Sequence, residues 1–400
     1  MTREEQTQLK RLQKREQRRR EREAWEAARG PLDLPFLLLV MILLGVGLVM
    51  LLSASFPSAQ AEGDAFAYIK RQLVFAAIGV FGMFWIGKIN YQRFRGVANI
   101  ALLVSFGLLL LVIIPGIGLT RNNATRWLGI PGSELTFQPT EVAKLGIIVY
   151  FAASIAKKRD RMLTVREGIV PYVVILAIVA VMVLLEPHLS GAILLVGIGA
   201  VMMVVGGIHW GWAAGGAGVG ALGVYTVLYT DFMERIGYNS HRITTWRDAF
   251  WDARDKSYQM AQSFITIGSG GLLGVGLGKS RQKFMFLPEE HNDFIFSVVC
   301  EELGLVGATL IMVLFSLLII RGYWLAIHAR DRFGSLLIVG VTTQIALQTF
   351  LNIAVVTGVI PATGISLPFF SYGGTALAIQ LAEMGIVLSV SRQIPAPKSD

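Results

Sequence analysis

The sequence predicts an all-α, polytopic integral membrane protein with about ten transmembrane helices and a large extracytoplasmic loop between helices seven and eight. Hydrophobic residues make up 54% of the 400 residues and charged residues only 16%, whereas a soluble domain has roughly 25% charged residues. Apolar runs reach the length of about 17 to 25 residues that a helix needs to cross a bilayer. The formal net charge is +9, but the basic residues gather at the N-terminus and in short loops, which is a topology signal and not a nucleic-acid footprint.

The chain begins with a basic arm, residues 1–33. Its opening sequence, MTREEQTQLKRLQKREQRRREREAWEAARG, is too charged for a signal peptide, which needs a short apolar core and a small-residue cleavage site. We expect a solvated, partly helical cytoplasmic tail, with an electrostatic contact to anionic lipid as the alternative.

Ten apolar runs follow the arm and form one membrane domain, residues 34–392, before a short cytoplasmic tail, residues 393–400. Each run has the length and composition of a transmembrane helix. The predicted spans are 34–54, 72–88, 97–118, 140–156, 168–185, 190–208, 210–230, 294–321, 333–359 and 375–391.

The loops after spans two, four and eight are basic, so the positive-inside rule places these loops and both termini in the cytoplasm. The residues concerned are Lys88, Arg93, Arg95, Lys157, Lys158, Arg159, Arg161, Arg166, Arg321, Arg330 and Arg332. The segments 119–139, 231–293 and 360–374 then lie outside. The segment 231–293 is too long for a simple connector, and we expect it to hold short helices of its own.

Glycine-rich segments favour close backbone packing over a nucleotide site. Span seven has Gly216 and Gly220 at G-x-x-x-G spacing, which favours close packing against another helix. The segment GVGLGKS follows Leu273, where a phosphate-binding loop requires glycine. We expect its glycines to give a tight backbone path along the membrane surface. The single cysteine, Cys300, excludes an internal disulfide and a cysteine-based zinc site.

Ionisable residues at the membrane edge are costly and are therefore candidates for function. Arg126 lies in the outer segment before span four. Glu141 and Lys144 lie where that span begins, three residues apart and therefore on one helical face. Two interpretations of this pair stay open: an ion pair that stabilises the helix end, or a direct contact with substrate.

Further ionisable residues flank spans six and eight. Glu186 and His188 occupy a very short outer turn, for which a structural role is favoured. Asp293 lies at the outer end of span eight, where it is either the N-cap of the helix or a functional carboxylate. Glu301 and Glu302 lie roughly 12 to 14 Å deeper in a regular helix. We expect them to pair within the bundle or to form a route for coupling.

The connection from span nine to span ten is dense in proline and glycine, with the sequence TGVIPATGISLPFFSYGGT over residues 357–375. Such a composition fixes an irregular backbone. Irregular backbone at membrane depth is tolerated only where it is buried in protein or lines a cavity. We expect this connection to line a cavity, and Ser371 within it is a candidate substrate-binding residue.

Spans four, eight and ten all begin at the outer face, so three helix N-termini, which suit phosphate groups, lie there. Basic residues of the outer segments add further donors, namely Arg126, Arg242, Lys279, Arg281 and Lys283. The physical expectation is an anionic, phosphorylated, lipid-attached substrate, handled on the outer side of a membrane with Asp293 available as a base.

Three long motifs resemble signature segments of one protein family. They are FQPTEVAKL, YQMAQSFITIGSGGLLGVGLGKSRQKFMFLPEEHNDFIFSVVCEELGLVG and TGVIPATGISLPFFSYGGTAL. Over about residues 34 to 392 the chain resembles the SEDS (shape, elongation, division and sporulation) family of the FtsW, RodA and SpoVE type. The resemblance implies a multi-pass peptidoglycan glycosyltransferase of the bacterial cytoplasmic (inner) membrane. Such enzymes polymerise lipid II, an undecaprenyl-pyrophosphate-linked disaccharide pentapeptide, on the outer face, usually with a class B penicillin-binding protein.

The resemblance also implies roles for particular residues. The catalytic aspartate is Asp293, within HNDFIF, and the glutamate and lysine of the Q-P-[ST]-E-x-x-K segment are Glu141 and Lys144. Two positions depart from the family pattern. Asn292 stands where the family usually has threonine, and His188 stands where an aspartate is frequent.

The implied mechanism makes Asp293 the general base for the acceptor sugar hydroxyl. The leaving pyrophosphate would be stabilised by basic residues, with or without a divalent cation, Mg²⁺ or Mn²⁺. We expect no protein metal site, no nucleotide or organic cofactor, and no nucleic-acid partner. The expected substrate-binding residues are Glu141, Lys144, Arg126, Arg242, Lys279, Lys283, His291 and Ser371.

Two other functions stay open at this point. Glu301, Glu302 and Glu383 lie within spans, and buried acids often mark substrate or proton paths, so the first is a lipid II flippase. The second is a scaffold that recruits and activates a partner penicillin-binding protein. A glycosyltransferase would polymerise lipid II, a flippase would translocate it, and a scaffold would do neither.

Overall fold

The structure is a computed structural model that describes residues 30–121, 124–129, 136–229 and 241–394, together with Glu16. Within these residues, eight helices are long and apolar enough to cross a membrane. They are α2 (Leu34–Ala61), α3 (Ala67–Lys88), α4 (Gln92–Ile113), α5 (Pro139–Lys158), α6 (Val170–Leu185) taken together with the π-helical turn Val165–Ile169 before it, α12 (Ile295–Ile327), α13 (Arg332–Val356) and α14 (Gly374–Ser391). The polytopic, mainly helical membrane architecture predicted from the sequence is confirmed.

Two more predicted spans also form helices. They are α7 (Leu189–Val205), which has 17 residues, and α8 (Trp210–Tyr229), which has 20. Each of the ten apolar runs is therefore helical in the structure, and eight of them meet the length and hydropathy of a span.

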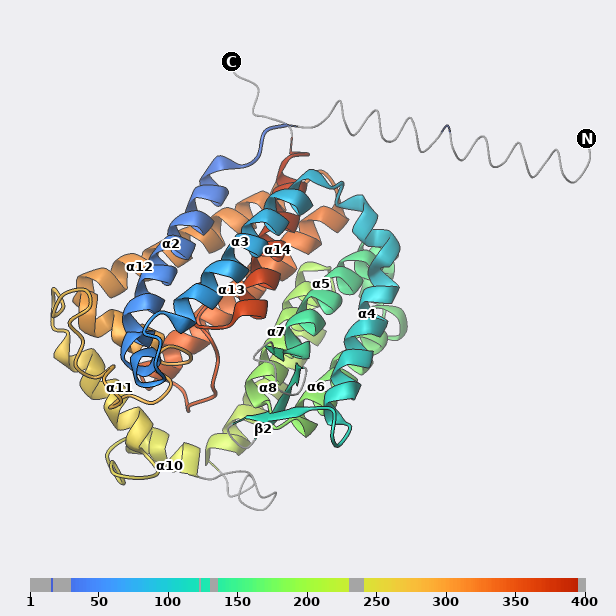
Figure 1. Cartoon of the computed structure of the whole chain (residues 1–400). Helices are drawn as coiled ribbons and strands as arrows, with labels where there is room; N and C mark the ends of the chain where they lie inside the picture. The colour runs from blue at the N-terminus through green and yellow to red at the C-terminus, as the bar shows by residue number, and fades with distance from the viewer. Residues whose placement is uncertain (1–15, 17–29, 122–123, 130–135, 230–240, 395–400) are drawn as a thin grey trace, which may run out of the picture.

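The two ends of the described chain meet at one end of the bundle (Figure 1). The Gly30 N–H donates to the Arg392 carbonyl at 2.7 Å, and the Arg392 guanidinium donates to the Gly30 carbonyl at 3.2 Å. The segments predicted to lie outside gather at the opposite end, where α10 (His241–Arg247), α11 (Tyr258–Ser269) and a small sheet are found (Figure 1). The expectation of short helices within 231–293 is confirmed for its described part.

The small sheet is the one departure from an all-helical fold in the described chain. It consists of β1 (Leu119–Arg121), β2 (Ala124–Gly129) and β3 (Thr136–Phe137), paired antiparallel in the order β1-β2-β3. The hydrogen-bonded ladder gives the outer segment before α5 a fixed path, so that β2 holds Arg126 over the end of the bundle.

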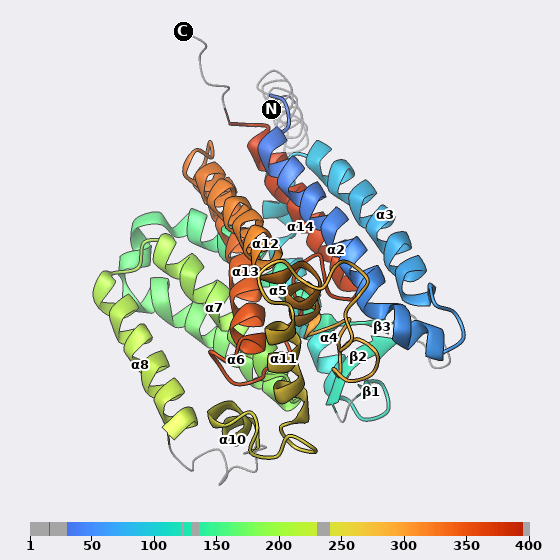
Figure 2. The ribbon, with the colours of Figure 1, turned by 90° about the vertical axis from the view of Figure 1, so that its left-hand side faces the viewer.

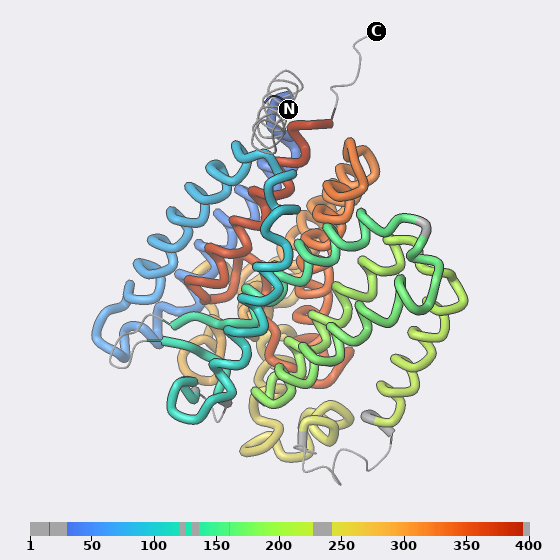
Figure 3. Tube along the Cα trace, turned by 90° about the vertical axis from the view of Figure 1, so that its right-hand side faces the viewer, coloured from blue at the N-terminus to red at the C-terminus, as the bar shows by residue number. Residues whose placement is uncertain are grey.

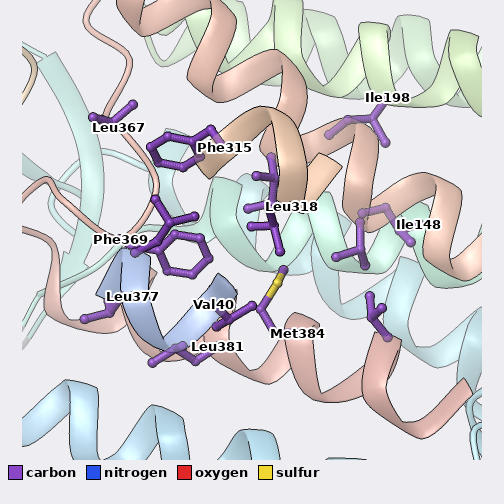
Figure 4. Close-up of a cluster of buried hydrophobic side chains, with 14 of the residues drawn as sticks. Val40, Ile148, Ile198, Phe315, Leu318, Leu367, Phe369, Leu377, Leu381 and Met384 are labelled. Atoms are coloured by element: carbon purple, nitrogen blue, oxygen red, sulfur yellow. The ribbon is translucent and has the colours of Figure 1, made fainter. Parts of the chain in front are cut away.

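The core lies between α5, α13 and α14. In these helices about seven-tenths of the most apolar stretch is buried inside the protein, whereas in α3 or α6 less than three-tenths is. The outer helices instead expose apolar side chains to the surroundings, as lipid-facing helices do. Side chains from α2, α5, α7, α12 and α14 meet in the buried cluster of Figure 4, which includes Val40, Phe315, Leu381 and Met384.

Helix α8 stands at the edge of the bundle (Figures 2 and 3). Trp210 and Val219 are 79% and 73% exposed. A Cβ atom added at Gly216 or Gly220 would meet no atom within 4 Å. The prediction that this glycine pair packs against another helix is therefore wrong for the described chain, because no described helix lies against that face.

Helix α12 is broken at Gly304, which has φ 66° and ψ −172°. The short piece before the break begins two residues after Asp293, and the long piece after it is the lipid-spanning helix. Residues 271–276 pack against the break: the Val275 N–H donates to the Glu301 carbonyl at 2.9 Å, and the Leu305 N–H donates to the Gly271 carbonyl at 3.0 Å. A Cβ at Gly274 would collide with the Glu302 carbonyl. The glycines thus provide the expected tight backbone path, but it runs against α12.

Candidate active site

Asp293 lies two residues before the first residue of α12, at the outer side of its short first piece. The N-cap of the helix is Phe294, and no side chain caps it, so the N-cap interpretation of Asp293 is wrong. In the part of the chain that the structure describes, the half-buried Asp293 carboxylate has no hydrogen bond. A Cβ added at Gly364 would lie 3.2 Å from Asp293 Oδ2, so glycine at this position keeps space beside the carboxylate.

Asn352, near the outer end of α13, fixes the backbone of Asp293. Its Nδ2 donates to the Asp293 carbonyl at 2.8 Å and to the Ile365 carbonyl at 2.6 Å. The side chain is buried. One amide group therefore joins α13, the start of α12 and the connection between α13 and α14. Asn352 was not among the predicted site residues, although an amide near the end of an otherwise apolar run was a signal for it.

The surroundings of Asp293 give it the properties of a general base. Burial, with a smaller contribution from Glu289, raises the pKa of Asp293 to about 6, while Arg126, Arg242 and His291 act in the opposite direction. A carboxyl group with this pKa is mostly ionised at neutral pH and accepts a proton more readily than an ordinary aspartate, which suits general base catalysis.

Two guanidinium groups from distant parts of the chain act electrostatically on this carboxylate and lower its pKa. Arg126 on β2 donates through Nε to the Glu186 carbonyl at 3.4 Å and also to the Pro187 carbonyl. Arg242 on α10 donates to the Ala362 carbonyl at 3.3 Å. The positive charge of each arginine lowers the pKa of Asp293 and so favours its ionised form. The structure thus brings together three residues that sequence analysis singled out separately.

His291 and Ser371 lie beside Asp293 and organise its segment. The Ser371 hydroxyl donates to the Asn292 carbonyl at 2.7 Å, and the Tyr372 N–H donates to the His291 carbonyl at 2.8 Å. The His291 ring lies 4.7 Å from the Tyr68 ring, centroid to centroid. These contacts place both residues at the site, and their predicted binding of substrate stays a prediction.

Glu141 and Lys144 form a buried ion pair in the first turns of α5. Lys144 Nζ lies 2.8 Å from Glu141 Oε2, and Lys144 is 1% exposed. The ion-pair interpretation is confirmed. The pair lies inside the bundle, and its contact with substrate stays a prediction.

Lys279 and Lys283 lie in the segment between α11 and α12. Lys283 is buried, 3% exposed, and its Nζ lies 2.8 Å from Glu302 Oε1 and 2.9 Å from Ser53 Oγ. Lys279 is exposed in the glycine-rich turn, where its N–H donates to the Gly276 carbonyl at 3.1 Å. Lys283 is therefore held in a buried ion pair, and the predicted binding of substrate by Lys279 and Lys283 stays a prediction.

The acids in α12 also have partners. Glu302 pairs with Lys283, and Glu301 Oε1 accepts from the Arg281 N–H at 3.0 Å. The Ser280 hydroxyl donates to Glu301 as well. The expectation that these acids pair within the bundle is confirmed.

Comparisons with known proteins agree on one family. The model of the FtsW, RodA and SpoVE family, described as "Cell cycle protein", matches residues 34–395. This chain belongs to the SEDS family. Its match covers the whole predicted membrane domain, so the three motifs and the fold point to the same assignment.

The alignments with similar SEDS proteins extend over almost the whole length of those proteins and most of this chain. "Stage V sporulation protein E" of Bacillus subtilis (strain 168) is 39% identical over 361 residues, which are 90% of this chain and 97% of that protein. "Probable peptidoglycan glycosyltransferase FtsW" of Geobacter sulfurreducens (strain DL-1 / KN400) is 40% identical over 368 residues, 90% of this chain and 95% of that protein.

Solved SEDS structures have the same fold. A chain from "Structural coordination of polymerization and crosslinking by a peptidoglycan synthase complex" matches with a TM-score of 0.75 and 28% identity over 92% of this chain and 99% of that chain. The crystal structure of the rod shape determining protein RodA of Thermus thermophilus matches with a TM-score of 0.65 and 26% identity over the same shares of the two chains.

In this SEDS protein, the turn between α6 and α7 contains a buried carboxyl group that sequence analysis took to be structural. Neither Glu186 oxygen has a hydrogen-bond partner in the described residues. Burial raises the pKa of Glu186 to about 8, against the effect of Arg126. Burial, with Arg126 and Lys144, lowers the pKa of His188 to about 3. The imidazole is therefore neutral, and its Nδ1 lies 3.4 Å from Thr140 Oγ1.

The expected divalent cation stays a prediction. Among the described residues no group of three or more His, Cys, Asp or Glu side chains has the arrangement of a metal site. Mg²⁺ in phosphate-handling sites is commonly held by one or two carboxylates together with substrate phosphates. Glu289, which acts electrostatically on Asp293, offers one carboxylate of this kind apart from the proposed base, so the residues fit a cation that is held mainly by the substrate phosphates.

Proposed function

We propose that this chain is a peptidoglycan glycosyltransferase that polymerises lipid II into glycan strands on the outer face of the bacterial cytoplasmic membrane. The observation that carries the proposal is the Asp293 carboxylate, which is half-buried, free of hydrogen bonds in the described structure, and subject to the positive charge of Arg126 and Arg242. The relatives named as peptidoglycan glycosyltransferases support the same reaction.

Asp293 accepts the proton of the 4-hydroxyl of the acceptor lipid II sugar as the hydroxyl oxygen bonds to the anomeric carbon of the donor chain. The bond from that carbon to undecaprenyl pyrophosphate breaks, and the electron pair leaves with the pyrophosphate. Because one base promotes one direct displacement, the anomeric configuration inverts. Arg126 and Arg242 stabilise the charge that develops on the leaving group.

The topology fits this reaction if α10, α11 and the sheet face the outside. The basic loops at the other end, and both termini, then lie in the cytoplasm, as the positive-inside rule indicates. Lipid II carries its pyrophosphate at the membrane surface, and Asp293 lies two residues before the spanning helix α12 begins, at the end of the outer segment.

The partner we propose is a class B penicillin-binding protein. The structural neighbour with a TM-score of 0.75 comes from a peptidoglycan synthase complex described as coordinating polymerization and crosslinking. Membrane lipid and lipid II complete the set of partners. A divalent cation, Mg²⁺ or Mn²⁺, would supply positive charge to the pyrophosphate if it arrives with the substrate.

The experiment supplies purified lipid II to the full chain, alone and with the partner, and measures glycan strands. Asp293→Ala is expected to abolish strand formation without loss of fold. Asp64→Ala is the matched control, because Asp64 is an exposed aspartate near the outer loops whose contact is with Lys70. Full activity of Asp293→Ala would exclude the mechanism.

Translocation of lipid II gains no support from the acids that suggested it, since Glu301 and Glu302 have partners within the bundle. A flippase would move lipid II across liposomes after Asp293→Ala. A scaffold would show neither strands nor translocation.

A further inference from the structure

Glu383 on α14 and Gln344 on α13 form a contact deep in the apolar bundle. Both side chains are 0% exposed. Gln344 Nε2 donates to Glu383 Oε2 at 2.7 Å. Their surroundings on α14 are apolar, since Leu381 and Met384 belong to the buried cluster of Figure 4. The glycosyl transfer described above uses neither residue.

Two oxygen atoms of this contact are left without partners. Glu383 Oε1 and Gln344 Oε1 are both buried, and neither has a hydrogen bond in the described structure. A buried acceptor without a donor costs free energy. A carboxylate oxygen and an amide oxygen are both acceptors, so they cannot satisfy each other. A protonated carboxyl group has one O–H donor, which is the group that this pair of acceptors lacks.

We propose that Glu383 is a proton-binding site, and that as a neutral carboxylic acid it pairs with Gln344 through two hydrogen bonds. Gln344 Nε2 donates to Glu383 Oε2, as observed. The bound proton on Glu383 Oε1 donates to Gln344 Oε1. Both groups are planar and of matching size, so a single proton satisfies both orphaned oxygens.

The charges around Glu383 support the same state. Its charged neighbours are Lys144 and Glu141 on α5, and these two already form an ion pair at 2.8 Å. If Glu383 were ionised, the three buried side chains Glu141, Lys144 and Glu383 would carry two negative charges and one positive charge. A neutral Glu383 leaves it balanced, which matters inside a membrane-spanning bundle, where an unpaired charge is expensive.

This inference goes beyond the proposed glycosyltransferase activity. The pair joins α13 to α14 without charge and leaves the Lys144 ammonium to Glu141. Because the O–H of Glu383 closes on Gln344, its proton is held in the pair and is not passed along a path. Glu383 was, with Glu301 and Glu302, one of the acids that suggested transport. In this pair it has a structural role in the bundle.

Infrared spectroscopy of the full-length protein in lipid tests the proposal directly. At neutral pH we expect a carbonyl-stretch band of protonated carboxylic acid in the wild type that shifts in D₂O. Its Glu383 component should be lost in Glu383→Gln, while the contribution of Glu186 remains in both proteins. That variant keeps two hydrogen bonds as an amide–amide pair, so its thermal unfolding midpoint and its activity should equal those of the wild type. The double variant Gln344→Glu/Glu383→Gln exchanges acid and amide and should restore the band.

Glu302→Gln is the matched control, because Glu302 is also a buried glutamate but has a lysine, Lys283, as its partner in an ion pair. Its unfolding midpoint should fall, since the lysine loses its counter-charge. Gln344→Leu should lower the midpoint as well, because it leaves the acid without a partner. The proposal is overturned if the wild-type and Glu383→Gln spectra coincide in the acid carbonyl region. It is equally overturned if Glu383→Gln loses as much stability as Glu302→Gln.

Discussion

Replacing Asn352 should show how much the rate depends on the position of Asp293, because the replacement leaves the Asp293 carboxylate itself unchanged. The Asn352 amide makes two short hydrogen bonds, one to the Asp293 carbonyl and one to the Ile365 carbonyl. Each bond contributes about 0.5–1.5 kcal/mol net, and a buried carbonyl left without a donor costs about 1–3 kcal/mol. For Asn352→Ala we expect a loss of about 2–4 kcal/mol of stability.

The effect on catalysis should exceed the effect on folding. A displacement of a catalytic group by about 1 Å costs about 10²-fold in rate, and Asn352→Ala removes the bond that fixes the Asp293 backbone. We expect kcat to fall about 100-fold while KM changes little, because Arg126 and Arg242 keep their backbone contacts.

The assay is strand formation from lipid II at a temperature where the variant stays folded, together with thermal unfolding. Gln348→Leu is the matched control, because Gln348 lies one turn earlier on α13, is equally buried and contacts Gln380 instead of the site. The control should lose stability and keep its kcat. Equal kcat values for Asn352→Ala and the control would refute the positioning role.

The remaining predictions concern charge. Because Asp293 acts when ionised and its pKa is about 6, the rate should rise with pH through about 6 and level off above it; a rate independent of pH down to about 5 would indicate an ordinary aspartate. Arg126→Ala removes a charge that lowers the pKa of Asp293, so the acidic limb of the pH–rate profile should move to higher pH and KM should rise; an unmoved profile would place Arg126 outside the site. Lys283→Met should cost about 3–5 kcal/mol of stability, as expected for a broken buried ion pair, with KM unchanged in the folded fraction; a raised KM at full stability would return Lys283 to substrate binding.

Local patterns in the sequence were sufficient for the helices and for some contacts within them. The spans follow from apolar length, and the Glu141–Lys144 pair follows from the spacing of neighbours on one helical face. Asp293 was expected at the start of span eight because the polar stretch ends there. These features depend on residues that are close in the sequence.

Features that depend on distant segments were not predictable in the same way. Lys283 appeared to be an outer cation, because its partners, Ser53 and Glu302, are joined to it only by tertiary folding. The break at Gly304 depends on the docking of the preceding glycine-rich turn. The sequence does not distinguish Asn352 from other polar residues, because its two partners, the carbonyls of Asp293 and Ile365, are brought to it only by the fold.

The most direct test of the account is strand formation from purified lipid II by the isosteric variant Asp293→Asn, compared with the wild type under identical conditions. The variant keeps the shape of the side chain and its backbone bond to Asn352, but it lacks a group that accepts the proton. The account predicts a stably folded protein that forms no glycan strands. Strand formation at the wild-type rate would contradict it.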